Sequence, residues 1–482
     1  MEKRKIIIDP VTRVEGHGRV TLHLNEQNQL EEARLHIVEF RGFEKFVQGR
    51  PYWEAPVLVQ RLCGICPVSH HLCAAKAIDQ IVGVSDETLT PTGRKMRRMM
   101  HFGQVLQSHA LHYFYLAAPD LLLGMNSDVA SRNVVGLAQM NQELAKKGIL
   151  LRKFGQEIIK ATAGKKIHGI SAVPGGIHKN MTDEEIQFFK DGKEVPSIEE
   201  TIQWCLEVLE HYKTFHLKNQ SDILSFDQLE SNYLSLIGRD GALELYHGEL
   251  RCVDKDGRKV IEDMDYLKYL DIYEEEVKEW SYMKFPFLKP LGAQKGWVRV
   301  GPLARINTCE YIDTPLAQKE LESFRSHNGR MPHGTLLYHW ARLIEILHCA
   351  EKIQELLDDE DIKGENLITK GTRTNTGIGF IEAPRGTLIH HYDVADDDQI
   401  TKCNLIVSTT HNNTAMNSSV FQRAKQIWET NPDRGEEFLN EIEVAIRAYD
   451  PCLSCATHAL GQMPLKVELR DFNDVEIRTF TR

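Results

Sequence analysis

Two short cysteine pairs, Cys63-Gly64-Ile65-Cys66 and Cys452-Leu453-Ser454-Cys455, lie near the two ends of the sequence. Each pair has the CxxC spacing, which can turn two thiolates toward one point. Almost the whole chain separates the pairs, so neither can be explained by the sequence around the other. If the fold brings them together, four sulfur atoms meet at one buried site, and the chain between them is the scaffold of that site.

The composition is typical of a large globular protein. The chain has 482 residues, of which 42% are hydrophobic and 26% are charged, and its net charge is -11. This length suits about three domains or one large helical body. The negative charge disfavours nucleic acid or an anionic membrane surface as the main partner, because both attract basic proteins.

We expect a cytoplasmic protein without a membrane span. No stretch approaches the run of about 18 apolar residues that a bilayer requires. The basic N-terminus is followed by only Ile6, Ile7 and Ile8 before an acidic residue, and this run is too short for the core of a signal peptide. The ten cysteines are then expected to be reduced.

The hydrophobic pattern predicts an α+β fold that is predominantly helical, with a core of long helices and peripheral antiparallel β-hairpins. Alternating apolar residues predict a hairpin over residues 20–38, inside an N-terminal region that extends to residue 50. Beyond residue 50 we expect a helical core with a β-rich insert. Its predicted elements are helices over 92–123, 196–221 and 333–357, a β-rich segment ending near 291, strands around 378–391 and 403–410, and a small hairpin at the C-terminus.

The first cysteine pair is expected to lie at the start of a helix. Pro67 directly follows Cys66, and proline suits the first position of a helix. Cys66 would then lie at a helix N-terminus, where the helix dipole favours thiolate over thiol.

Several kinds of site could explain the two pairs. A lone CxxC in a long chain can arise by chance or from simple packing, and a thioredoxin-like redox pair would explain one CxxC but not two. A structural zinc site of four cysteines is the main rival, although zinc ribbons usually keep their pairs about 12–20 residues apart. Thiolates also bind nickel, copper(I) and iron–sulfur clusters, so sulfur ligands alone leave the metal open.

The sequence around both pairs resembles the two metal-binding signatures of nickel–iron hydrogenase large subunits. These signatures are residues 61–70 (RLCGICPVSH) and 450–458 (DPCLSCATH). Three further motifs resemble the family, at residues 13–17 (RVEGH), 41–44 (RGFE) and 382–386 (EAPRG), and all five occur along the chain in the family's order. The resemblance covers the whole chain and is strongest to the soluble bidirectional, NAD-reducing type. It implies the hydrogenase large-subunit fold and the reversible heterolytic cleavage of dihydrogen.

The resemblance implies a nickel–iron centre at the cysteines. All four thiolates would bind nickel, with Cys63 and Cys452 as terminal ligands and Cys66 and Cys455 bridging to iron. The iron would carry carbon monoxide and cyanide ligands. A related component of respiratory complex I has lost the metal and would suggest a non-catalytic role, but that relative lacks the four cysteines that are present here.

Two side chains are implied to act directly on the reaction. Glu15 matches the carboxylate that receives the proton from a nickel-bound cysteine, and a carboxylate within hydrogen-bond reach is a sensible base for that proton. Without the motif, Glu15 would read as an ordinary exposed glutamate. Arg385 matches the arginine held over the nickel, where its charge polarises the dihydrogen pocket and its donors reach a cyanide. Without the motif, it would read as part of a surface turn.

Four further side chains are implied to support the centre. His70 matches the histidine that hydrogen-bonds a bridging sulfur, although a histidine there could also serve packing. Thr409 aligns with the hydroxyl that donates to the second cyanide, but its segment lacks the proline common elsewhere in the family. Asp120 and Asp450 correspond to buried acids that hold the arginine in place.

A second metal site and a processing step are also implied. Glu44 and His458 match the ligands of a magnesium ion, or a third iron, near the C-terminus, and a carboxylate, an imidazole and waters suit a hard octahedral cation. Residues 1–458 would form a single body. Residues 459–482 would be an extension that an endopeptidase removes after His458 once nickel is in place, with the help of a maturation chaperone.

The electrons from dihydrogen must leave through a partner. The chain has no Rossmann or flavin signature and no further paired cysteines for an iron–sulfur cluster. The resemblance implies a small subunit with an iron–sulfur cluster and, in the bidirectional type, diaphorase subunits with FMN and NAD. The remaining cysteines have no paired spacing and are expected in the core; they are Cys73, Cys205, Cys252, Cys309, Cys349 and Cys403.

Overall fold

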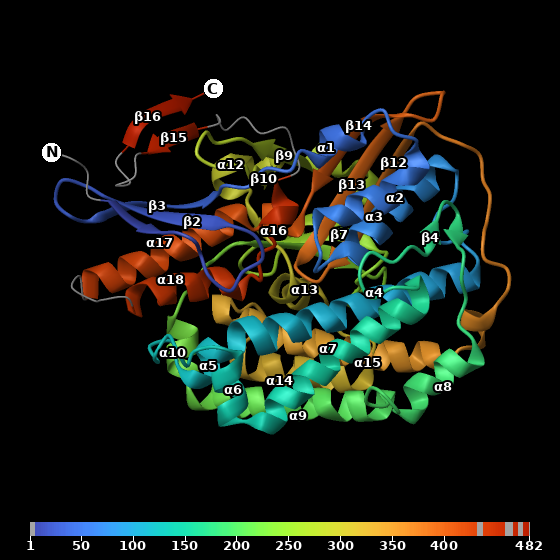
Figure 1. The fold of residues 1–482 in the computed structure, drawn as a ribbon, viewed down its shortest axis with the longest axis horizontal. Helices are drawn as coiled ribbons and strands as arrows, with labels where there is room; N and C mark the ends of the chain where they lie inside the picture. The colour runs from blue at the N-terminus through green and yellow to red at the C-terminus, as the bar shows by residue number, and fades with distance from the viewer. Residues whose placement is uncertain (1–4, 431–436, 458–465, 471–475, 482) are drawn as a thin grey trace.

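The computed structural model describes residues 5–430, 437–457, 466–470 and 476–481. Four long helices pack side by side across the lower half of Figure 1 and form the centre of the fold: α4 (Pro91–Leu111), α7 (Gln142–Ala163), α9 (Ile198–Lys218) and α15 (Tyr338–Leu357). The apolar repeat of α15 is buried throughout, with Trp340, Ile344 and Leu347 fully inaccessible. The predicted core of long helices is therefore confirmed.

Local signals explain where these helices begin and how closely they pack. A capping box of Ser197 and Glu200 starts α9. Helices α4 and α7 meet at two glycines, since a Cβ on Gly155 would lie only 2.6 Å from the carbonyl oxygen of Gly103.

The predicted helix 92–123 is present but changes pitch, with a π-helical turn at His112–Ala117 before α5 (Ala118–Leu123). Pro119 lacks the amide that a continuous α-helix would use there.

An antiparallel sheet and short helices form the N-terminal region. The predicted hairpin is confirmed as β2 (Gly18–Leu24) and β3 (Leu30–Ile37), and β1 (Lys5–Ile8) pairs with β2 as a third strand. After α1 (Phe43–Val47) and α2 (Ala55–Leu58), helix α3 (Pro67–Ile81) begins at the predicted proline, directly after Cys66.

A second antiparallel sheet packs against α3. It consists of β12 (Thr376–Ala383), β13 (Gly386–Val394) and β14 (Ile400–Ile406) in that order. The backbones approach closely because β12 has glycine at the contact: a Cβ on Gly379 would lie 2.1 Å from the Cys73 carbonyl oxygen. The predicted strand 403–410 is wrong at its end, because Ser408–His411 forms the short helix α16. There the Ser408 hydroxyl donates to the Gly386 carbonyl.

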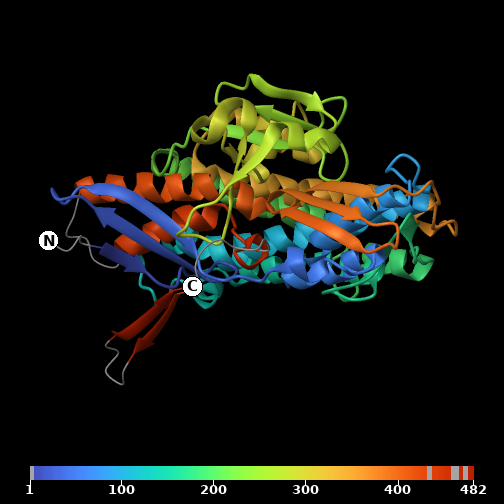
Figure 2. The same cartoon turned by 90° about the horizontal axis from the view of Figure 1, so that it is seen from above.

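The predicted β-rich insert forms a lobe that protrudes from the body in Figure 2, in green and yellow. Its sheet has the order β11-β6-β7-β8, and a hairpin of β9 and β10 lies beside it. The strands are β6 (Asn232–Ile237), β7 (Glu249–Val253), β8 (Lys259–Met264), β9 (Tyr273–Glu276), β10 (Phe285–Leu288) and β11 (Val298–Arg299), and the short helices α11 (Tyr269–Ile272) and α12 (Gly292–Lys295) lie between them in the chain. Two following helices, α13 (Pro302–Thr308) and α14 (Pro315–Asn328), pack against α15.

The remaining elements lie at the edges of the helical core or near the C-terminus. They are α6 (Val134–Met140), α8 (Asp183–Asp191), α10 (Gln220–Ser225), β4 (Ala172–Val173), β5 (Gly176–Ile177), α17 (Asn413–Thr430), α18 (Glu437–Ala448), β15 (Lys466–Arg470) and β16 (Glu476–Thr481). The last two strands pair antiparallel, as predicted, and project from the body in Figure 2. The division into a body and a removable extension stays a prediction.

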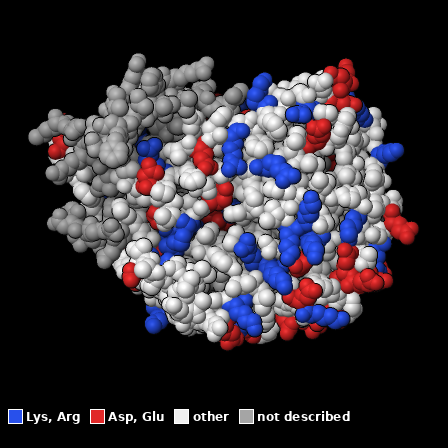
Figure 3. Space-filling model, viewed as in Figure 1, with Lys and Arg blue, Asp and Glu red and all other residues white. Residues whose placement is uncertain are grey.

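The surface carries charges of both signs. On the face seen in Figure 3, lysine and arginine side chains alternate with aspartate and glutamate and form no extended field of one sign. Among the described residues, no helix combines the length and the hydropathy that crossing a membrane requires.

A buried ion pair joins α3, α4 and the β4–β5 turn. Arg97 is fully buried, forms two hydrogen bonds to Asp79, and donates to the carbonyls of Val173 and Gly176. We expect Arg97→Met to lower the stability by about 3–5 kcal/mol, because it leaves a buried carboxylate without its partner. Thermal melting of the purified chain measures this. The control Lys147→Met, at a more exposed ion pair, should cost about 1 kcal/mol or less; equal losses would contradict the assignment.

Candidate metal centre

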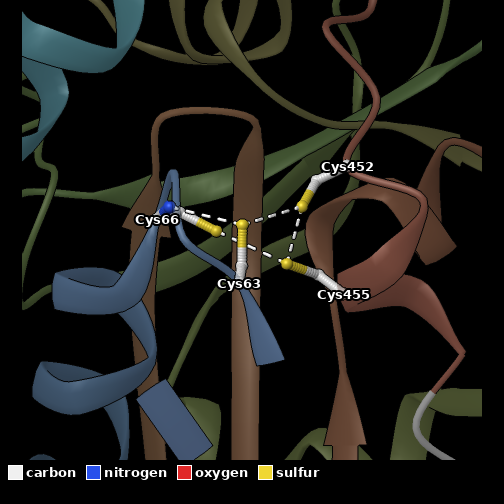
Figure 4. A group of neighbouring side chains, drawn as sticks. All are labelled: Cys63, Cys66, Cys452 and Cys455. Carbon is white, nitrogen blue, oxygen red and sulfur yellow. Dashed lines mark hydrogen bonds between the residues drawn. The ribbon is translucent and has the colours of Figure 1, made fainter. Parts of the chain in front are cut away.

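The four cysteines of the two CxxC pairs meet at one buried point. Their sulfur atoms all lie within 4.8 Å of one another, and they form the only such group of potential metal ligands among the described residues. Figure 4 shows Cys63 and Cys66 entering from the loop before α3, and Cys452 and Cys455 from the segment after α18. The Sγ–Sγ distance is 3.3 Å between Cys63 and Cys452, and 3.5 Å between Cys66 and Cys455.

All ten cysteines are buried and none forms a disulfide. The six outside the centre lie in the core, as expected, and burial raises the pKa of their thiols. They therefore stay protonated at neutral pH and serve packing, which leaves the four converging thiols as the group suited to a metal.

The N-terminal motif RVEGH holds the second cysteine pair in place. The backbone of Glu15 forms a parallel β-bridge with Cys452, and the Leu453 amide donates to the Glu15 carbonyl at 2.9 Å. Gly16 has a φ of +83°, and a Cβ there would lie 2.8 Å from the amide nitrogen of Ser454. Only glycine fits both constraints, so this position is fixed by the approach of the C-terminal segment.

The thiols differ in their readiness to ionise. Hydrogen bonds from the neighbouring thiols, above all Cys452, hold the pKa of Cys63 well below its usual range. Burial raises the pKa of Cys452 and of Cys455 well above theirs. A metal ion that binds all four sulfurs must therefore displace protons, which is the usual coupling between thiolate ligation and pH.

The Glu15 side chain hydrogen-bonds one of the sulfurs. Its Oε2 accepts from the Cys452 thiol at 3.0 Å and from the Ser454 amide at 3.1 Å. The Ser454 hydroxyl donates to Glu39 at 3.1 Å, and Glu39 contacts the exposed ring of His17. Polar groups thus lead from the sulfurs to the surface. Ser454 and Glu39 are not identified in the sequence analysis, although Ser454 lies inside the second CxxC.

Arg385 lies beside the cysteines and is held by Asp450. Its Nε donates to the Asp450 carbonyl at 2.5 Å and its Nη2 to the Asp450 carboxylate at 3.0 Å. Burial alone would lower the pKa of Arg385, but Asp450 and the cysteine thiolates outweigh it and raise this pKa well above its usual value. The guanidinium is therefore a permanent positive charge next to the sulfurs.

The donor set fits a nickel–iron centre. Arg385 lines a cavity of about 10 Å³ next to Cys66 and Cys452, and its Nη1 is buried without a hydrogen-bond partner among the described residues. Thr409 lines the same cavity, and its hydroxyl accepts the Cys452 amide at 2.9 Å, which leaves the hydroxyl proton available to donate. Soft thiolates with unsatisfied donors beside them suit a metal that carries acceptor ligands.

His70 also lines this cavity, and its hydrogen bond to a cysteine sulfur stays a prediction. Its Nδ1 lies 3.1 Å from the Nε2 of His390, and the Nδ1 of His390 lies 2.7 Å from the hydroxyl of Tyr392. A buried chain of rings therefore reaches the side of the first cysteine pair. No short-range motif marks His390 or Tyr392, so the sequence alone does not predict that they lie here.

Asp120 lies elsewhere than expected. Its carboxylate is buried but binds Arg13 and Arg447, and no contact between described residues joins it to Arg385. The expectation that Asp120 holds Arg385 is therefore wrong, because Asp120 belongs to an ion cluster that ties the N-terminal motif to α18. Asp450 alone of the two expected acids contacts Arg385.

The second expected metal site is described only in part. Glu44 lies in the first turn of α1 and accepts the Leu405 amide at 2.8 Å. The Arg41 amide donates to the Thr457 carbonyl at 3.1 Å, so the C-terminal segment passes close to this region. His458 lies outside the described residues.

Comparisons with known proteins agree with this geometry. Residues 5–40 match a family model described as HoxL-like, and residues 41–148 and 220–458 match the model of nickel-dependent hydrogenases. The NAD-reducing hydrogenase HoxS subunit beta of Cupriavidus necator is 50% identical, over 97% of each chain. An F420-non-reducing hydrogenase of Methanothermobacter thermautotrophicus is 40% identical, over 96% of each chain.

Solved structures share the fold. The structure of an NAD+-reducing NiFe-hydrogenase in the H2-reduced state superposes with a TM-score of 0.91 and 54% identity, over 94% of this chain and 99% of that chain. A NiFeSe-hydrogenase of Dm. baculatum has 23% identity and a TM-score of 0.74, over 95% of this chain and 100% of that chain, and supports the fold alone. With four buried sulfurs converging as the signatures predict, the chain belongs to the family of nickel-dependent hydrogenase large subunits.

Proposed function

We propose that this chain is the catalytic subunit of a hydrogenase that cleaves dihydrogen reversibly at a nickel–iron centre and passes the electrons on toward NAD. The observation that carries the proposal is the convergence of the four cysteine sulfurs within 4.8 Å at a buried point. All four thiolates would hold nickel, and two of them, those of Cys66 and Cys455, would also hold iron. When bound, the two metals and the iron's carbon monoxide and cyanide ligands supply the Lewis-acid and redox chemistry of dihydrogen cleavage.

Glu15 receives the proton of the cleavage. Its Oε2 lies 3.0 Å from the Cys452 sulfur, which is hydrogen-bond distance for transfer from a thiol to a carboxylate. The Ser454 amide binds Glu15, the hydroxyl of the same residue donates to Glu39, and Glu39 contacts the exposed His17. A proton held at the Cys452 sulfur therefore has a carboxylate within reach and polar groups beyond it.

Arg385 and the groups around it shape the dihydrogen pocket. Its guanidinium places a fixed positive charge beside the sulfurs, and Asp450 holds the side chain in position through two hydrogen bonds. The Nη1 of Arg385 and the hydroxyl of Thr409 supply donors for the cyanide ligands. His70 lines the same cavity and would support the sulfur of Cys66.

Partner subunits carry the electrons away. The relative with 50% identity is named an NAD-reducing hydrogenase subunit, which favours a small subunit with an iron–sulfur cluster and diaphorase subunits with FMN and NAD. A cytoplasmic location suits this acceptor.

Maturation completes the centre. Glu44 and His458 would bind magnesium, or a third iron, where the C-terminal segment passes the N-terminal region. A chaperone would deliver the metals, and an endopeptidase would then cut after His458 and remove residues 459–482. The hairpin of β15 and β16 belongs to this removable extension.

Infrared spectroscopy of the purified complex tests the proposed function. We expect absorption bands of metal-bound carbon monoxide and cyanide, because the cavity beside the cysteines offers donors to such ligands. Metal analysis of the same sample should find nickel. Zinc without nickel, together with a spectrum that lacks these bands, would reject the proposal in favour of a structural zinc site.

Cys455→Ser tests the ligand set and the maturation step together. Serine is a poor ligand for a soft metal, so we expect less than about a tenth of the wild-type nickel per chain and no hydrogenase activity. Intact mass should show that the variant keeps residues 459–482, whereas active wild-type enzyme ends at His458. The control Cys252→Ser, a buried cysteine in β7, should assemble and be processed normally. A nickel-replete, active Cys455→Ser enzyme would refute the ligand assignment.

Glu15→Gln tests the proton acceptor. The amide keeps the size and the contact with the Ser454 amide but cannot take up a proton. We expect hydrogen–deuterium exchange and dihydrogen oxidation to fall by about 10²–10⁴-fold, with nickel content unchanged. The control Glu31→Gln changes an exposed glutamate in β3 and should have no effect. Normal turnover by a metal-loaded Glu15→Gln enzyme would show that another group accepts the proton.

A further inference from the structure

The turn that carries Arg385 rests on a second buried arginine. Arg305, in α13, is 1% exposed. Its Nη1 donates to the Ala383 carbonyl at 3.0 Å and its Nη2 to the Pro384 carbonyl at 3.1 Å. These are the two residues immediately before Arg385 in the β12–β13 turn, so Arg305 binds the backbone from which the active-site arginine extends.

Two buried glutamates fix Arg305 in turn. Its Nε and Nη2 each donate to a different oxygen of Glu345 at 2.6 Å, and its Nη1 donates to Glu382 at 2.9 Å. With the two carbonyls, all five N–H donors of the guanidinium are used. Burial would raise the pKa of Glu345, but the Arg305 charge outweighs it and lowers that pKa to about 2. The pair is therefore ionised, and its fork geometry is rigid.

The carboxylates are themselves anchored to separate elements. Glu345, on α15, also lies 2.8 Å from the Nε2 of His109 on α4. Glu382, at the end of β12, accepts the Thr387 hydroxyl at 2.7 Å and the Leu236 amide at 3.0 Å. The network thus joins the helical core and the β6 strand to both sides of the β12–β13 turn.

Close backbone packing also holds the turn. A Cβ on Gly301, which has a φ of +97°, would lie 2.8 Å from the Arg385 carbonyl oxygen. A Cβ on Gly386 would lie 2.6 Å from the Gly301 amide nitrogen. The segment before α13 therefore lies directly against the turn, and the same short helix then supplies Arg305.

We infer that Arg305, clamped by Glu345 and Glu382, is a positioning residue that sets the place of Arg385 beside the metal centre. The inference rests on the proposed function, because Arg385 matters only if a nickel–iron centre forms. It also gives a role to Glu382, the first residue of the EAPRG motif. The competing explanation is that the network only stabilises the fold, as buried ion pairs often do.

Arg305→Lys separates these explanations. Lysine keeps the charge but offers three donors from one point instead of a five-donor fork, so the turn loses part of its support. We expect dihydrogen oxidation by the metal-loaded complex to fall by about 10–100-fold, which is typical when a group that orients an active-site side chain is changed. The infrared bands of the cyanide ligands should shift, while nickel content stays at the wild-type level.

A matched control is available at Arg97. This arginine is also fully buried, forms two hydrogen bonds to a carboxylate, and donates to two carbonyls of a turn, but that turn is β4–β5. Arg97→Lys should lower the melting temperature at least as much as Arg305→Lys without shifting the cyanide bands. Equal band shifts in both variants, or in neither, would overturn the inference.

A double-mutant cycle with Arg385→Lys tests whether Arg305 acts through Arg385. In the Arg385→Lys background, Arg305→Lys should reduce the rate by less than about twofold, because the side chain that it positions is already changed. If the fold-losses in rate of the two single variants multiply in the double variant, Arg305 acts by another route and the inference is rejected. If Arg305→Lys gives no folded complex, Glu382→Gln replaces it in the double-mutant cycle, because it weakens the same ion pair. The same loss of less than about twofold in the Arg385→Lys background is then expected.

A crystal structure provides a readout that needs no metal. In the Arg305→Lys chain the turn at residues 383–386 should be displaced, and in Arg97→Lys it should not. An unmoved turn would refute the positioning role even if the spectra changed. Absence of carbon monoxide and cyanide bands from the wild-type enzyme would instead contradict the proposed function, so the two failures are distinguishable.

Discussion

The β-bridge between Glu15 and Cys452 is the contact on which the metal centre depends. It joins a loop near the start of the chain to the second cysteine pair near its end, and the Leu453 amide donates to the Glu15 carbonyl across it. The same residue that supplies this backbone contact places its carboxylate 3.0 Å from the Cys452 sulfur. One contact therefore brings the second cysteine pair to the first segment and sets the proposed proton acceptor beside it.

Charge is the second constraint on the centre. Arg385 and Asp450 are both almost fully buried, and burying ions without partners costs several kcal/mol each. The structure meets this cost by pairing them with each other and by placing thiols that can ionise next to the guanidinium. A second buried arginine, Arg305, is paired in the same way with the carboxylates of Glu345 and Glu382. A positive charge can thus stand beside the sulfurs in an interior that would otherwise exclude it.

The sequence predicts those parts of the structure that depend on local signals. Pro67 marks the start of α3, and alternation between residues 20 and 38 marks β2 and β3. Prediction from the sequence fails where a partner far away along the chain determines the local structure or the contact. Ser408 begins the short helix α16, where its hydroxyl donates to the distant Gly386 carbonyl, and Asp120 pairs with Arg13 and Arg447 rather than with Arg385. The role of Arg305 is likewise invisible in the sequence, because its partners lie 40 to 79 residues away along the chain.

The two cysteine pairs differ in how they are held, and this difference bears on how the centre is assembled. Cys66 lies at the start of a fifteen-residue helix that packs tightly on β12 and β13, so the first pair is fixed by the core. The second pair lies on a segment without long regular structure, anchored by the Glu15 bridge, the Thr409 hydroxyl and the Asp450–Arg385 pair. Glu15, Thr409 and Arg385 all lie far from this segment along the chain. The first pair is therefore held by the packing of its own helix, whereas the second pair depends on contacts with distant parts of the chain.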